Sequence, residues 1–107
     1  MNERVTPDGR YFVVRGRLWR RANPTLPMER RDALLRELLA AQGAVKAALK
    51  SGKPEELALA RKAVDVSKIA LGERGPVWWT DGEPDLNRQK VSSSPYAEWW
   101  AASHPRR

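Results

Sequence analysis

The chain offers few side chains that could carry out catalysis. Its single histidine, His104, lies three residues from the C-terminus and precedes Pro105, so nothing is expected to orient its imidazole for proton transfer. A serine–histidine–carboxylate triad would need that histidine. Because the chain has no cysteine, thiol nucleophiles, disulfides and zinc–thiolate sites are excluded. We therefore expect a protein that is not an enzyme.

Acidic and amide side chains alternate in one stretch of the C-terminal third, at positions 81, 83, 85 and 87. The first ligands of a calcium loop have this spacing, but such a loop needs glycine at its sixth position and glutamate at its twelfth. Here the glycine is at the second position, Gly82, and the twelfth residue is Ser92. The other glycines form no dinucleotide-binding or phosphate-binding pattern. We therefore expect no metal and no other cofactor, and we expect Asp81 and Asp85 to bond turn amides or to pair with Arg88.

A basic and aromatic stretch near the N-terminus has side chains suited to nucleic acid. Arginines could contact phosphates there while Tyr11 or Trp19 stacks on a base, as in proteins that bind single strands. The residues assigned to this role are Arg15, Arg17, Trp19, Arg20 and Arg21. We favour the competing interpretation that Phe12, Leu18 and Trp19 dock the stretch onto helices, because an isolated hairpin is not stable. Nucleic-acid binding is therefore the alternative function.

Four of the five tryptophans form two doublets, Trp78-Trp79 and Trp99-Trp100. We expect at least one ring of each doublet to be buried, each covering about 150–250 Å². Adjacent side chains do not easily face the same way, so the other ring would be exposed beside charged residues, as at protein-binding hot spots. The residues predicted to contact a partner are Trp78, Trp79, Asp81, Asp85, Arg88 and Trp100.

The composition is that of a small globular protein. With 107 residues, 41% hydrophobic and 31% charged, the chain is expected to form one domain. The net charge of +7 is concentrated near the N-terminus, where residues 1–26 hold six arginines against two acidic residues, and such an excess favours a polyanionic partner. The N-terminus lacks the apolar stretch of a signal peptide, and charges interrupt the apolar stretch 34–49. We therefore expect no membrane segment and a cytoplasmic location.

The elements that must position these side chains begin with a β-hairpin over residues 9–21. The stretch is aromatic and β-branched, which is typical of strands. A two-residue turn at Arg15-Gly16 would pair Val14 with Arg17, with Gly16 supplying the positive φ that such turns need. Arginine is a less favourable first turn residue than Asn or Asp. The alternative is one long strand, with one face formed by Tyr11, Val13, Arg15, Arg17 and Trp19.

Two helices follow, over residues 27–50 and 54–71. Each begins with a proline, which suits the first helical position because its missing N–H has no intrahelical partner there. Apolar residues recur every three or four positions in both. The three-residue link 51–53 requires the helices to lie antiparallel. The second helix carries an additional apolar stripe and is therefore expected to touch two neighbours; this stripe is Leu59, Ala63, Val66 and Ala70.

Residues 76–102 are expected to form an irregular, tryptophan-rich tail. It ends in a short helix capped by Ser94 with Pro95 at its first position. We expect the tail to wrap over the helix pair and to cover the additional stripe. The predicted fold class is therefore α+β and mainly α: an N-terminal β-hairpin, an antiparallel two-helix hairpin and a Trp-rich irregular C-terminal segment, in a single small domain, 1–107.

Two sequence patterns resemble those of a family of small uncharacterised bacterial proteins. They are RYFVVRGRLWR, starting at Arg10, and ALGERGPVWW, starting at Ala70. The resemblance extends from about residue 8 to residue 100, and some family members carry a label as Tol-type biopolymer transport proteins. It implies a bacterial cytoplasmic setting and the order of elements given above, and no catalytic or binding residue. Family members have Asp where this chain has Arg15, which favours the hairpin over the long strand.

These observations predict a small accessory or adaptor protein that binds another protein through its helical hairpin and its Trp-rich tail. The identity of the partner does not follow from the sequence, and a homodimer is left open as an alternative.

Overall fold

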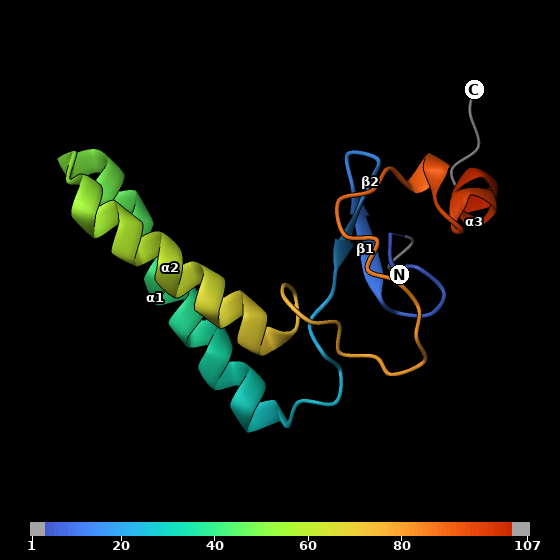
Figure 1. Cartoon of the computed structure of the whole chain (residues 1–107), viewed down its shortest axis with the longest axis horizontal. Coiled ribbons are helices and arrows are strands. Elements are labelled where there is room, and N and C mark those ends of the chain that lie inside the picture. The colour runs from blue at the N-terminus through green and yellow to red at the C-terminus, as the bar shows by residue number, and fades with distance from the viewer. Residues whose placement is uncertain (1–3, 104–107) are drawn as a thin grey trace. The chain divides into compact units, whose positions relative to one another are not determined.

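The computed structural model describes residues 4–103, so His104 lies outside the described residues (Figure 1). The order of elements is β1 (Tyr11–Val14), β2 (Arg17–Arg20), α1 (Met28–Ser51), α2 (Pro54–Leu71), the 3₁₀ helix η1 (Val91–Ser93) and α3 (Ala97–Ser103). The predicted fold class, α+β with mainly helix, is confirmed. Within the described residues, no helix is long and apolar enough to cross a membrane.

The residue contacts group the chain into two compact units and not around a single core. One unit, which we call the hairpin unit, joins the described parts of Met1–Arg21 and Trp79–Arg107. The other, the helical unit, is Ala22–Trp78. The expectation of a single domain over 1–107 did not foresee this division. Each unit is therefore described by itself.

The β-hairpin has the predicted register, with Val14 opposite Arg17 and Phe12 opposite Trp19. Both turn residues have positive φ, 53° at Arg15 and 77° at Gly16, as two-residue hairpin turns require. The alternative of one long strand is therefore wrong. Both edges of the hairpin are extended, because Val5 forms a bridge with Phe12 and Lys90 forms one with Arg17. Segments from the two ends of the chain thus flank the same hairpin.

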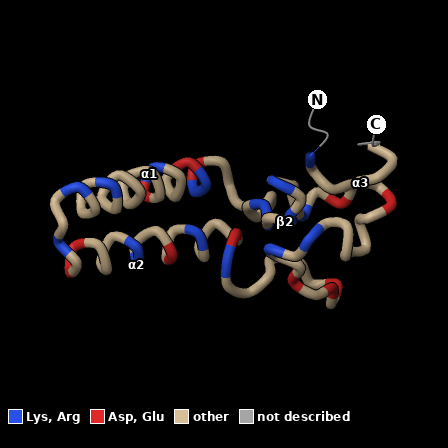
Figure 2. Tube along the Cα trace, turned by 90° about the horizontal axis from the view of Figure 1, so that it is seen from above, with Lys and Arg blue, Asp and Glu red and all other residues tan. Residues whose placement is uncertain are grey.

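The helices α1 and α2 lie side by side and antiparallel in the helical unit (Figures 1 and 2). Leu34 and Leu38 of α1 and Leu71 of α2 form a buried cluster between them. The helix α1 ends at Gly52, whose φ of 69° lets its amide donate to the Ala48 carbonyl. The boundaries agree with the predicted ranges 27–50 and 54–71 to within one residue.

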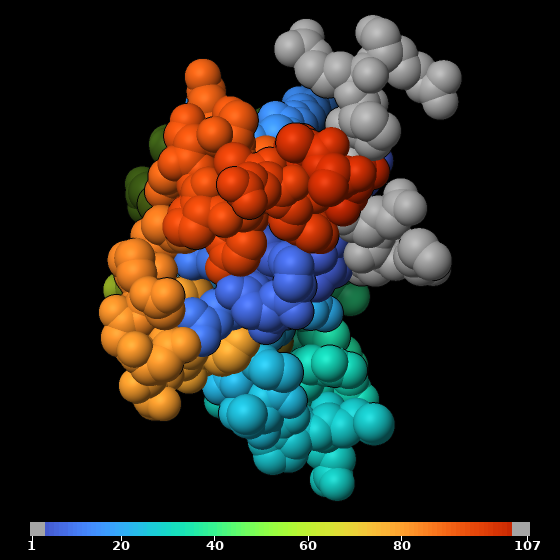
Figure 3. All heavy atoms as spheres, turned by 90° about the vertical axis from the view of Figure 1, so that its right-hand side faces the viewer, coloured from blue at the N-terminus to red at the C-terminus, as the bar shows by residue number. Residues whose placement is uncertain are grey.

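The apolar side chains of the tail that are buried lie in the hairpin unit. Trp79 and Val91 are buried within the hairpin unit, and Figure 3 shows the C-terminal segment, in orange and red, against the blue N-terminal segment. Leu59 and Val66 remain 70% and 57% exposed. The expectation that the tail buries its apolar side chains against α2 does not hold for Trp79, which lies in the core of the hairpin unit. Ser94 Oγ accepts a hydrogen bond from the Tyr96 amide, as a capping side chain does, but α3 begins at Ala97, so Pro95 is not its first residue as predicted.

Candidate functional site

The five residues assigned to nucleic acid are not arranged as a phosphate-binding surface. Arg20 is the clearest case, because its side chain is 0% exposed and its Nη1 lies 2.9 Å from Asp85 Oδ2. Its amide also donates to the side-chain oxygen of Asn87 at 2.9 Å. A buried guanidinium already paired with a carboxylate cannot reach a phosphate without disrupting the fold. The assignment of Arg20 to phosphate binding is therefore wrong.

The other members of that set are partly engaged in the hairpin unit. Arg17 Nη1 donates to the Arg88 carbonyl at 2.8 Å, and Arg21 Nη1 donates to the Gly9 carbonyl at 3.2 Å. Trp19 is half-buried, and the guanidinium of Arg88 lies 5.7 Å from its ring centre. Arg15 is exposed at the turn. The Trp19 face is therefore already stacked on a cation rather than open to a base.

The residues predicted to contact a partner are divided between the two units. Trp78 belongs to the helical unit, where a side chain on Gly72 would clash with its ring. Trp79 belongs to the hairpin unit and is only 8% exposed; its ring N–H donates to the Glu83 carbonyl. Trp100 is half-buried beside Trp99, with ring centres 5.9 Å apart. Trp79 therefore serves as a core residue, and its predicted role in partner contact is wrong.

Asp81 and Asp85 shape the loop between Trp79 and the 3₁₀ helix. Each carboxylate accepts a hydrogen bond from the backbone amide two residues further on: Asp81 from Glu83, and Asp85 from Asn87. The sequence predicted such bonds to turn amides. Their cationic partners are Arg10 and Arg20 rather than Arg88. The predicted pairing with Arg88 is wrong because Arg88, with a φ of 74°, lies over Trp19 instead.

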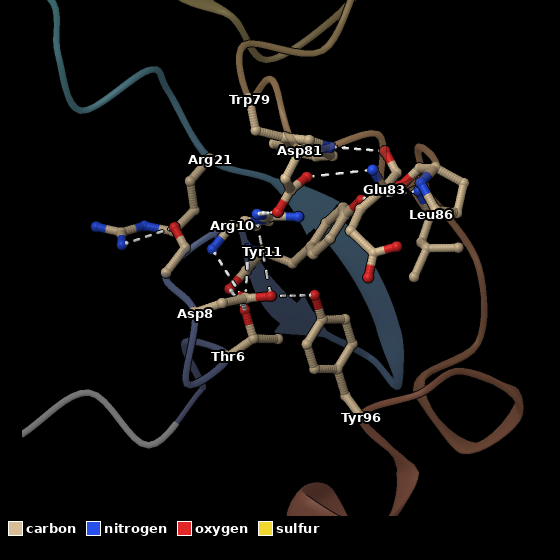
Figure 4. Close-up of polar contacts among 12 residues, drawn as sticks. Thr6, Asp8, Arg10, Tyr11, Arg21, Trp79, Asp81, Glu83, Leu86 and Tyr96 are labelled. Atoms are coloured by element: carbon tan, nitrogen blue, oxygen red, sulfur yellow. Dashed lines mark hydrogen bonds and ion pairs between the residues drawn. The ribbon is translucent and has the colours of Figure 1, made fainter.

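A polar cluster around Asp8 joins the two ends of the hairpin unit (Figure 4). Its carboxylate accepts hydrogen bonds from the hydroxyls of Tyr96, at 2.5 Å, and of Thr6, at 2.7 Å. Arg10 lies between Asp8 and Asp81 and stacks on the Trp79 ring at 4.7 Å. No local pattern in the sequence pointed to this cluster, because Asp8 and Tyr96 are 88 residues apart.

The cluster shifts several pKa values. Burial alone would raise the pKa of Asp8, but hydrogen bonds from Tyr96 and Thr6 outweigh it and lower that pKa below 3.8. The Arg10 guanidinium lowers the pKa of Asp81. Burial, reinforced by the hydrogen bond to Asp8, raises the pKa of Tyr96, and burial raises that of Tyr11. All of these shifts stabilise the protonation states that the groups have at neutral pH.

A pocket of about 270 Å³ opens beside this cluster. It is lined by Asp8, Arg10, Tyr11, Glu83, Pro84, Leu86, Pro95 and Tyr96. Most of its polar groups bond one another, since Tyr96 donates to Asp8 and the Leu86 amide donates to the Tyr11 hydroxyl. Among residues 4–103, no group of three or more His, Asp or Glu side chains could hold a metal ion. The pocket therefore presents no arranged nucleophile and base.

The helical unit carries two apolar surfaces, and different residues form each. The first, which we call the leucine face, follows one side of α1, where Leu35, Leu39 and Leu49 share a stripe at helical spacing. Leu39 is 67% exposed and Leu49 57%. An adjoining hollow of about 390 Å³ is lined by Gln42, Val45, Arg61, Val64 and Arg74. Figure 2 shows Lys and Arg along both helices.

The second surface, which we call the alanine groove, is an open hollow of about 600 Å³ between α1 and α2. Its lining residues are Glu37, Ala40, Ala41, Leu59, Lys62, Ala63, Val66 and Ser67. The sequence identified the stripe of α2 that borders it but assigned the tail as its cover. Exposure of these side chains was therefore not foreseen.

Comparison with protein-family models, with curated proteins and with solved structures gives no match for this chain. The resemblance to a bacterial family thus stays a prediction, and the functional argument rests on the two units themselves.

Proposed function

We propose that this protein is a small adaptor that binds another protein through the leucine face of its helical hairpin. The observation that supports this proposal is the exposure of Leu39 and Leu49 in a regular stripe on a well-formed helix. Exposed apolar side chains that gather on one side of a helix are typical of protein-binding surfaces, whereas ones scattered singly are ordinary.

The partner we propose is an amphipathic helix with acidic residues along its edges. Leucines at helical spacing form the kind of groove into which such a helix lays its apolar side. The surrounding charges are mostly basic: Arg61 and Arg74 line the adjoining hollow, and Lys46 lies within the stripe on α1. Arg74 Nη1 lies 3.1 Å from Asp65 Oδ1. Both side chains of this ion pair are partly exposed, so Arg74 can exchange Asp65 for an acidic side chain of the partner.

The hairpin unit supports this role less well. Its apolar rings pack on one another, with Trp79 edge-on to Tyr11 at 5.7 Å. Binding of nucleic acid also has less support than it had from the sequence, because Arg20 is buried and Arg17 donates to a carbonyl. We therefore restrict the proposed contact surface to the helical unit.

The proposal is tested by replacing Leu39 and Leu49 together by serine. The immobilised full-length protein is incubated with an extract of its own host, and retained proteins are purified and their affinity is measured. We expect the double variant to bind its partner at least about tenfold more weakly, as for loss of hot-spot side chains. Affinity of the unchanged protein should also fall as salt is raised, since the partner is acidic.

The matched control places serine at Ala44, which is exposed and, five residues from both Leu39 and Leu49, lies on another side of the same helix. This control should retain the partner with unchanged affinity. Equal binding by the leucine variant and the control would contradict the proposal, provided that circular dichroism shows both to be folded.

A further inference from the structure

The alanine groove has two unlike walls. The α1 wall is small and acidic, with Ala40, Ala41 and Glu37. The α2 wall is basic, and its larger side chains Leu59, Val66 and Lys62 stand beside the smaller Ala63 and Ser67. Leu59 and Val66 are more than half exposed, although both lie on a regular helix of 18 residues. Exposing apolar side chains of this size to water is unfavourable, so a partner that covers them is stabilised by their burial.

The sizes of the two walls fit one another. A two-fold axis that runs along the groove, parallel to the helices, places the α1 wall of one copy against the α2 wall of the other, and both copies then use the same patch. Leu59 and Val66 of one copy would then lie over the alanines of its partner. Large side chains packed over small ones allow helices to approach closely, as in ridge-and-groove packing.

The charges of the walls fit in the same way. Glu37 lies on α1 and Lys62 lies on α2, and neither takes part in an ion pair within residues 4–103. The same two-fold operation brings Glu37 of each copy toward Lys62 of the other, which gives two equivalent pairs. An unrelated partner would not require the groove to carry one charge of each sign on opposite walls.

We propose that a second copy of this chain occupies the alanine groove, so that two helical hairpins form a four-helix bundle. Helices of 24 and 18 residues are long enough for this, since α2 alone spans about 27 Å. The leucine face is made of other residues and stays accessible on both copies. This inference does not depend on the proposed adaptor function, and one can fail without the other.

The test is sedimentation equilibrium of the full-length protein between about 1 µM and 200 µM, a range that covers ordinary homodimer affinities. We expect a concentration-dependent shift from monomer to dimer. A protein that stays monomeric throughout that range would overturn the proposal. Val66→Asp should abolish the dimer, with Leu39→Asp on the leucine face as the matched control that leaves it unchanged.

A charge exchange keeps the test decisive if Val66→Asp fails to fold. Glu37→Lys and Lys62→Glu should each weaken the dimer about tenfold, because each places like charges together. The double variant carrying both changes restores the opposite pairing and should dimerise like the unchanged protein. Single and double variants that dimerise equally would place the contact elsewhere and overturn the proposal.

Discussion

The hydroxyl of Tyr96 donates to the carboxylate of Asp8 across 88 residues of sequence. This one bond ties the segment before α3 to the turn before β1. Tyr11, at the centre of the same unit, meets both Tyr96 and Trp79 edge-on, with ring centres 5.8 and 5.7 Å apart. At the scale of single residues, the hairpin unit is therefore held by contacts between its two distant segments rather than by local pairs.

The ionisation of the tyrosines gives a direct test of this arrangement. Both of the chain's tyrosines have pKa values above the ordinary 10, mainly through burial. Stability from their neutral forms is fully present below pH 10 and is lost as the pH rises through the folded-state pKa values. Absorbance at 295 nm should therefore show no native titration centred at pH 10, whereas the unfolded chain should titrate there. A native midpoint near 10 would contradict the packing described for Tyr11 and Tyr96.

The buried pair of Arg20 and Asp85 gives a second prediction. Asp85→Asn removes the charge opposite a side chain that is 0% exposed. We expect a loss of about 1–3 kcal/mol in the free energy of unfolding, because a buried cation loses a charged partner. Urea unfolding followed by tryptophan fluorescence measures it. The control is Asp81→Asn, whose carboxylate pairs with Arg10 in an exposed position and should matter little. Equal effects from the two changes would show that Arg20 does not depend on Asp85.

At the scale of elements, the strand register and the helix ends could be predicted from the sequence, because turn and cap residues determine them locally. The Arg15-Gly16 turn fixes the strand register locally, and Pro27, Pro54 and Gly52 mark the helix ends by backbone constraints that act over a few residues. The surface against which the tail packs could not be predicted in the same way. Trp79 could equally have covered α2, and only contacts with the distant Tyr11 decide against it. The leucine face was missed for the same reason. Whether Leu39 is exposed depends on which distant segments of the chain pack against α1, and the local sequence does not specify them.

Gly72 tests how α2 ends. Its φ is 93°, and a Cβ there would lie 2.9 Å from the Trp78 ring and 3.2 Å from the Asn23 amide nitrogen. Gly72→Ala should therefore destabilise the helical unit by about 1–3 kcal/mol, through backbone strain and the clash together. The thermal midpoint of the signal at 222 nm reports it. Gly52→Ala is the control, because its φ is 69° but nothing lies within 4 Å, so only about 1 kcal/mol is expected. A Gly72 variant no less stable than the Gly52 variant would contradict the described end of α2.

At the scale of the whole molecule, the two units divide the roles. The hairpin unit uses its aromatic rings and most of its arginines internally, as Trp79, Arg17 and Arg20 illustrate. The helical unit buries Leu34, Leu38 and Leu71 but leaves leucines exposed on α1 and α2. The surfaces open to other molecules therefore belong mainly to the helical unit.

The most direct test of the proposed adaptor role is a scan with a photo-crosslinking residue in the living host. The crosslinker is placed singly at position 39 on the leucine face, at position 59 in the alanine groove, at position 100 in the tail and at position 15 in the hairpin turn. We predict that position 39 captures a protein other than this chain and that position 59 captures a second copy. Capture of another protein, or of nucleic acid, from position 100 or 15 but not from position 39 would contradict the account.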